Sequence, residues 1–103
     1  MVNLVIYLKK EFDPVGLVEK LLNTQLIASA SIDQNNESFT MQDGILSKEI
    51  YNVITAQTKS LLFTKIAKMI EGEFGPGVPV NATPIVVSNK IFDELLRSRT
   101  LKT

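Results

Sequence analysis

The feature that most constrains the fold is the dipeptide Asp43-Gly44, which stands between two runs of extended character. On its N-terminal side, Phe39 and Met41 alternate with polar residues, as in a strand with one apolar face. On its C-terminal side, residues 45–57 form a long run with apolar residues on both faces. Asp-Gly pairs favour hairpin turns because both turn positions can adopt positive φ. The sequence therefore predicts a long antiparallel β-hairpin in the middle of the chain.

The segments before the hairpin alternate between strand and helix patterns. Residues 2–8 are rich in β-branched and aromatic side chains and predict a central strand. Asp13 and Pro14 then suit the N-cap and the first position of a helix. Residues 26–33 resume extended structure, and the polar cluster at 34–37 predicts a turn.

After the hairpin the same alternation continues. Ser60 begins a second helical pattern, which the glycines from Gly72 onward are expected to break. Residues 80–87 predict a last strand, and Pro84 places that strand at a sheet edge or a bulge. Ser88 is the expected cap of a terminal helix whose apolar residues repeat at helical spacing.

This order of elements predicts the fold class. A strand, a helix, a long hairpin, a helix and a strand are followed by one more helix. One sheet with two helices on one face is the simplest way to bury the apolar stripes. We therefore expect an α+β protein with a ferredoxin-like split βαβ sandwich, a long antiparallel β-hairpin and an extra C-terminal helix. A chain of 103 residues suits one domain, so residues 1–103 are predicted to form a single unit.

Composition narrows the possible functions. The chain has no His and no Cys, which removes the commonest transition-metal ligands and most pairs of nucleophile and base. We accordingly predict no catalytic residues, no metal ligands and no cofactor. Eleven basic residues balance eleven acidic ones, which disfavours nucleic acid and anionic membranes as partners. The apolar run at residues 2–8 is too short to cross a bilayer and is followed by lysines, so a cytoplasmic location is expected.

Several segments carry a family resemblance. The sequence Leu-Ile-Ala-Ser-Ala-Ser-Ile at 26–32 stands where one family usually has Leu-Ala-Ala-Cys-Val-Asn-Ile. Phe39 and Met41 stand in place of a Tyr-x-Trp hairpin, and residues 78–79 and 82–85 match Val-Pro and Ala-x-Pro-Ile. In their order and intervals these segments resemble the CutA divalent-ion tolerance family, relatives of the PII signalling proteins. The resemblance covers roughly residues 2–97.

The resemblance implies a function as well as a fold. It predicts a homotrimer that is associated with divalent metal ion tolerance or response and is not an enzyme. The chain departs from the family pattern where Ser29 replaces a cysteine, Met41 a tryptophan, and residues 74–80 a His-Pro-Tyr-Glu-Val-Pro-Glu segment. These departures predict a divergent member that has lost the usual metal and ligand residues. The alternative is a PII-like regulator that binds a small ligand or nucleotide in a cleft between subunits.

The resemblance also suggests where such a cleft would lie. PII-like proteins hold ligands between subunits, and the matching positions here are five residues of the hairpin region: Phe39, Met41, Glu49, Gln57 and Lys59. A small anion, met by Lys48 and Lys59, or a divalent cation is the expected ligand. An acylphosphatase, which shares this fold, is disfavoured because the loop at 9–14 lacks both glycine and arginine.

Overall fold

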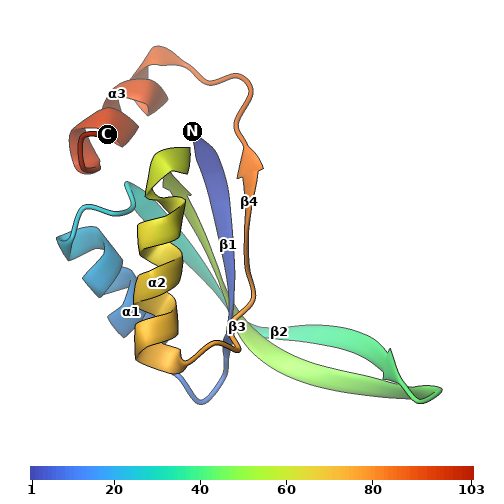
Figure 1. The fold of residues 1–103 in the computed structure, drawn as a ribbon. Coiled ribbons are helices and arrows are strands. Elements are labelled where there is room, and N and C mark those ends of the chain that lie inside the picture. Colours follow the sequence, from blue (N-terminus) through green and yellow to red (C-terminus); the bar gives the residue numbers. More distant parts are fainter.

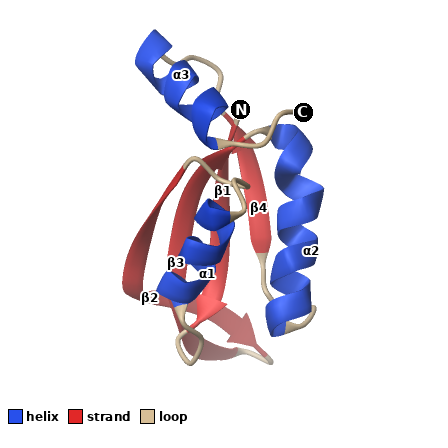
Figure 2. Ribbon diagram, turned by 90° about the vertical axis from the view of Figure 1, so that its left-hand side faces the viewer, coloured by secondary structure: helices blue, strands red, loops and turns tan.

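Figure 1 shows a computed structural model, which describes residues 1–103. Its elements in chain order are β1 (Val2–Lys9), α1 (Pro14–Asn23), β2 (Ser29–Gln42), β3 (Ile45–Thr58), a 3-10 turn (Ser60–Leu62), α2 (Phe63–Phe74), β4 (Val80–Pro84) and α3 (Lys90–Arg99). The strands form one antiparallel sheet in the order β2-β3-β1-β4. Helices α1 and α2 lie side by side over one face of this sheet, and α3 lies at the end where β1 begins (Figure 2). The predicted ferredoxin-like α+β fold is therefore confirmed.

The core lies between the sheet and the two covering helices. Strand β1 is central, as predicted, and its alternate residues Leu4, Ile6 and Leu8 are fully buried. Twelve buried residues form one apolar cluster: Leu4, Ile6, Leu8, Leu17, Leu21, Leu26, Ile27, Ile54, Ala56, Leu62, Ile66 and Ile70. None of them comes from the outer part of the hairpin. No helix is long and apolar enough to cross a membrane.

Helices α1 and α3 begin with side-chain caps. The Asp13 carboxylate accepts a hydrogen bond from the Val15 amide at 3.1 Å, and the prediction of this cap is confirmed. The predicted cap at Ser88 is wrong, because Asn89 accepts the hydrogen bond from the Phe92 amide at 2.9 Å. Ser88 donates instead to a carboxylate within the first turn of α3.

The hairpin confirms the predicted turn but corrects the strand before it. Asp43 and Gly44 have φ of 52° and 76°, the positive values that a two-residue turn requires. The turn predicted at 34–37 is wrong, because β2 runs through these residues and absorbs the irregularity as a bulge between Asp33 and Asn36. Asn35 has a φ of 57° at this bulge, and pairing with β3 resumes at Asn36. Of the glycines expected to break the second helix, Gly72 does not, because α2 continues to Phe74. The break expected at residues 75–77 is confirmed, since Gly75 caps the helix with a φ of 84°.

The outer half of the hairpin projects away from the body as a bare two-stranded ribbon (Figure 1). The molecule measures 47 × 28 × 21 Å and its radius of gyration is 14.7 Å. A compact chain of this length has a radius of gyration of about 13 Å. The excess reflects the ribbon, which has no helix over either face.

The terminal helix is covered less than its pattern suggests. Of its apolar residues only Leu96 is buried, whereas Ile91 is 67% exposed and Leu95 is 42% exposed. Helix α3 meets the end of the body instead of lying over the sheet (Figure 2), and most of its apolar stripe stays exposed.

Candidate ligand sites on the hairpin and at its base

The five residues predicted to line a cleft are spread along the hairpin. Phe39 and Met41 lie in its outer half, Glu49 lies midway, and Gln57 and Lys59 lie at the opposite end of β3. Gln57 lies eight positions after Glu49 along the strand, a span of about 27 Å at the usual rise. Within one protomer these side chains do not converge. Their meeting between subunits stays a prediction.

The strand register divides the outer ribbon into two unlike faces. Residues that are directly opposite share a face, and Phe39 is opposite Lys48 while Met41 is opposite Leu46. Phe39, Met41 and Leu46 are 53%, 68% and 64% exposed on this apolar face. The other face carries mainly polar side chains: Ser38, Thr40, Gln42, Ser47 and Glu49. Two residues depart from this division: Lys48 lies on the apolar face opposite Phe39, and Ile45 lies on the polar face opposite Gln42. The residues expected on both faces of the strand lie in the second half of β3, where Val53 and Ile54 are buried.

Gln57 is engaged in a hydrogen-bonded row across three strands. Its Oε1 accepts from the Ser29 hydroxyl at 2.5 Å, and its Nε2 donates to Asn3 Oδ1 at 3.0 Å. These groups lie on the sheet face that no helix covers. The row links β2, β3 and β1, so Gln57 has a structural role in the protomer.

Lys59 holds the C-terminal segment. Its Nζ donates to the Leu101 carbonyl at 2.8 Å, and the Leu101 amide donates to the Gln25 carbonyl at 2.9 Å. Lys48 lies far along the same strand and is 3.9 Å from the Glu37 carboxylate in an exposed ion pair. The two lysines expected to share an anion are therefore at opposite ends of β3 in one protomer.

Two adjoining hollows lie at the base of the hairpin, and the sequence did not single them out. The larger, of about 370 Å³, is lined by Lys9, Lys10, Glu11, Lys48, Glu49 and Ile50. The smaller, of about 150 Å³, is lined by Tyr7, Lys9, Glu11, Phe12, Phe74, Gly77 and Val78. Lys9 and Glu11 line both hollows, which therefore adjoin, and we call the two together the base groove. The one sequence signal for it is the Lys9-Lys10 pair, which alone is typical of a solvated strand end.

The acidic side chains do not form a metal site within the protomer. No group of three or more Asp or Glu side chains comes together in the protomer, and the chain has no His or Cys to add. The base groove brings Glu11 and Glu49 together with three lysines, a donor set that does not fit a cation.

The sheet order, the two helices on one face and the long hairpin define the molecule as a ferredoxin-like α+β protein with a projecting ribbon. No family model and no curated protein match the sequence. Solved structures match it over nearly its whole length. CutA1 from Pyrococcus horikoshii is 17% identical, with a TM-score of 0.84 over 99% of this chain and 100% of that chain.

Two further matches agree with the first. The divalent cation tolerance protein Cut A1 from Thermus thermophilus is 18% identical, with a TM-score of 0.82 over 97% of this chain and 99% of that chain. CutA1 from Oryza sativa is 21% identical, with a TM-score of 0.83 over 99% of this chain and 94% of that chain. The chain therefore has the CutA fold, as its segments predicted, and the low identities fit a divergent sequence.

Proposed function

We propose that this chain is a divergent CutA-like protein that assembles as a cytoplasmic homotrimer and takes part in divalent metal ion tolerance or response without catalysing a reaction. The fold supports the proposal, because solved structures with this fold carry the name of divalent cation tolerance proteins. The proposal assigns no resident metal, since no donor cluster exists in the protomer.

The observation that carries the proposed assembly is the uncovered apolar face of the ribbon. A two-stranded ribbon alone is marginally stable in water. This ribbon nevertheless extends over the outer halves of β2 and β3 and exposes more than half of Phe39, Met41 and Leu46. Copies of the same chain would cover this face and also bury the ribbon's free edges.

The open face of the sheet gives independent support. Its residues include Val5 and Tyr7, which are half-buried, and both covering helices lie over the other face of the sheet (Figure 1). The Tyr7 and Tyr51 rings meet edge to face, with centroids 5.9 Å apart. A face that carries valine and tyrosine beside Ser, Thr and Asn suits an interface better than open water.

Light scattering coupled to size exclusion tests the assembly. We expect the mass of a trimer at micromolar concentration, and a monomer after Phe39→Ser combined with Met41→Ser, because both changes remove apolar area from one ribbon face. The matched control combines Thr40→Ser and Gln42→Ser, which alter the alternating positions on the polar face, and it should remain a trimer. A monomeric wild-type protein would refute the proposed assembly.

The cellular role needs a separate test. Deleting the gene in its own host should lower the concentration of Cu²⁺ or Zn²⁺ at which the cells still grow. Reintroducing the wild-type gene should restore growth, and reintroducing the Phe39→Ser, Met41→Ser variant should not. Unchanged tolerance in the deletion strain would contradict the role while leaving the assembly standing.

A second candidate function is a PII-like regulator that binds a small anionic ligand. The base groove favours it, because Lys9, Lys10 and Lys48 converge on a hollow of about 370 Å³, a volume typical of small-ligand sites. A ligand that binds only the folded state raises the melting temperature by mass action. Thermal-shift screening should then show a shift with small anions and none with divalent cations. The reverse result would favour the ion-response role.

A further inference from the structure

We propose that the base groove binds a small aromatic carboxylate, with the ring in the smaller hollow and the carboxylate in the larger. The inference rests on the second candidate function for the existence of a ligand and goes further by naming its chemistry. Every residue of the groove belongs to one protomer. Its test is therefore separable from the test of the trimer.

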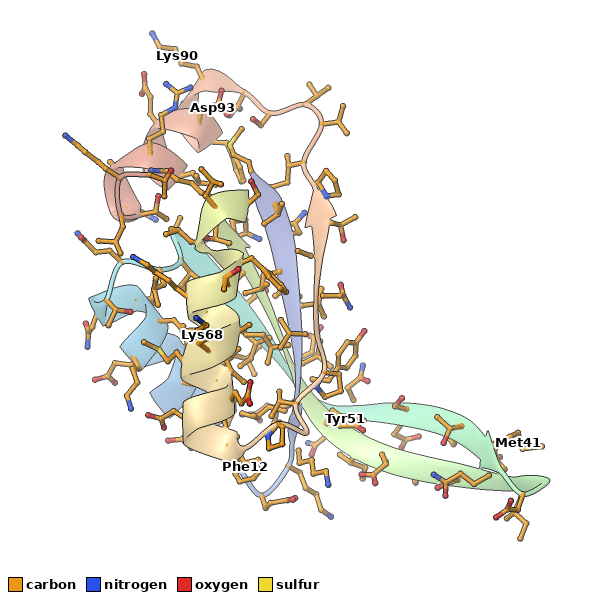
Figure 3. The ribbon with its side chains drawn as sticks, in the orientation of Figure 1. Phe12, Met41, Tyr51, Lys68, Lys90 and Asp93 are labelled. Atoms are coloured by element: carbon orange, nitrogen blue, oxygen red, sulfur yellow. The ribbon has the colours of Figure 1, made fainter.

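The ring subsite is aromatic on several sides. The Phe12 and Phe74 rings lie 4.9 Å apart at a tilt of 53°, and Tyr7 lines the same hollow. All three are half-buried, so each keeps some surface for a ligand. Figure 3 shows Phe12 at the lower end of α2, on the side where Tyr51 marks the departure of the ribbon. Planar rings pack favourably against aromatic side chains in tilted or offset arrangements.

Gly77 lines the ring subsite and has no side chain to occupy it. A Cβ placed on Gly77 would meet no heavy atom within 4 Å, and Gly77 does not have the positive φ that Gly75 has. The backbone conformation of Gly77 does not require glycine, so a side chain can be introduced at this position in the hollow. Gly77 and Phe74 both lie in the segment 74–80, where the chain departs from the CutA sequence pattern. The inference gives this altered segment a role.

The charged subsite favours a single negative charge. The ion pairs of the protomer involve Lys20, Lys48 and Lys90, which leaves the ammonium groups of Lys9 and Lys10 without a carboxylate partner within 4.0 Å. A ligand carboxylate would supply one through charge-assisted hydrogen bonds. Glu11 and Glu49 line the same hollow as Lys9, Lys10 and Lys48, so the formal charge there is too small to neutralise a polyphosphate but matches one carboxylate. The balance of charges selects a carboxylate over ATP.

The two glutamates also distinguish two sources of the ligand. An aromatic α-amino acid presents an ammonium group beside its carboxylate, and Glu11 or Glu49 would accept hydrogen bonds from it. A plain aromatic acid lacks that group. Tighter binding of L-phenylalanine than of phenylacetate would identify an amino acid as the ligand, and the reverse order would identify a simple acid.

Isothermal titration calorimetry on the assembled wild-type protein tests the ligand class. We expect phenylacetate or L-phenylalanine to bind about tenfold more tightly than acetate, which lacks the ring, or benzyl alcohol, which lacks the charge. ATP should bind more weakly than either ring carboxylate. No heat with both ring carboxylates at millimolar concentration, or equal affinity for acetate, would overturn the proposal.

Variants locate the site. Gly77 lines the ring subsite and a Cβ there meets no heavy atom within 4 Å, so Gly77→Leu should place a bulky side chain at the subsite and weaken ring carboxylates by about tenfold or more. Lys9→Gln combined with Lys10→Gln should weaken them similarly but leave the weak binding of benzyl alcohol unchanged. The control is Lys68→Gln, an exposed lysine on α2 away from the groove (Figure 3). Circular dichroism and light scattering confirm that each variant is folded and assembled. Full affinity in both groove variants would overturn the assignment, whatever the oligomeric state.

Discussion

The body and the outer ribbon share the same two strands, yet they are stabilised in different ways. On β3, Ile54 is fully buried against the helices, whereas Leu46 is 64% exposed near the tip. All twelve residues of the apolar cluster lie in the body. The ribbon depends on its backbone ladder and on cross-strand pairs such as Phe39 with Lys48. Strand β3 is therefore part of the protomer's core at its C-terminal end and is exposed to solvent near the hairpin tip.

This difference predicts that substitutions in the body and in the ribbon have different effects. The body needs no partner for its core, so its substitutions should act on protomer stability. The ribbon and the open sheet face gain little from the protomer, so their substitutions should act on assembly. The base groove lies where the two regions meet, and it takes Lys9 and Phe12 from the body and Glu49 from the ribbon.

The largest expected difference between the regions is that between Ile54→Ala and Leu46→Ala. In the monomeric Phe39→Ser, Met41→Ser background, Ile54→Ala should lower the free energy of unfolding by about 2–5 kcal/mol, because it leaves a cavity in the core. Leu46→Ala should change it by less than about 0.5 kcal/mol, as exposed positions do. Urea denaturation followed by circular dichroism measures both. Equal losses would mean that the ribbon folds back onto the body.

A pair of threonines gives the next largest difference. Thr58 is fully buried and its hydroxyl donates to the Leu26 carbonyl at 2.5 Å, whereas Thr40 is exposed on the ribbon. Thr58→Val should cost about 1–3 kcal/mol, since the Leu26 carbonyl loses its hydrogen bond out of reach of water. Thr40→Val should cost less than about 0.5 kcal/mol. Thr58→Ser, which keeps the hydroxyl, should recover part of the loss; if it does not, packing of the methyl group is the main contribution.

The local features of the fold were predictable, and the non-local ones were not. The Asp43-Gly44 turn and the Asp13 cap depend on the conformation of a few neighbouring residues, and the sequence identified both. The bulge at Asn35 forms because β2 pairs with β3 on both sides of it. The polar composition of residues 34–37 does not reveal this long-range pairing. Ser88 and Asn89 can both cap a helix, and only the path of the chain after β4 decides between them.

The candidate sites show the same limit. Family resemblance selected positions along the hairpin, but the register pairs Glu49 with Ser38 and so places Glu49 and Phe39 on different faces of the ribbon. The base groove is built from segments near residues 9–12, 48–50 and 74–78, which only the folded chain brings together. The sequence could not assign Lys9 and Lys10 to a binding site, because the other groove residues Glu49 and Phe74 are far from them along the chain.

Two glycines extend the comparison of the ribbon and the body to smaller expected effects. Gly44 has a backbone conformation that favours glycine, and Gly72 does not. Gly44 at the ribbon tip has φ of +76°, so Gly44→Ala places a side chain in the left-handed region and should destabilise the turn by about 1–2 kcal/mol. Gly72 lies inside α2 with open space around it, so Gly72→Ala should stabilise the body by about 0.5–1 kcal/mol.

Hydrogen exchange followed by mass spectrometry resolves where each glycine substitution acts. In the assembled protein, Gly44→Ala should speed exchange only near the ribbon tip, and Gly72→Ala should slow exchange across the body. The two regions then open separately, as expected when few apolar contacts join them. Faster exchange throughout the body in Gly44→Ala would instead show that the ribbon and the core unfold as one unit. Destabilising the turn would then also destabilise the strands of the core.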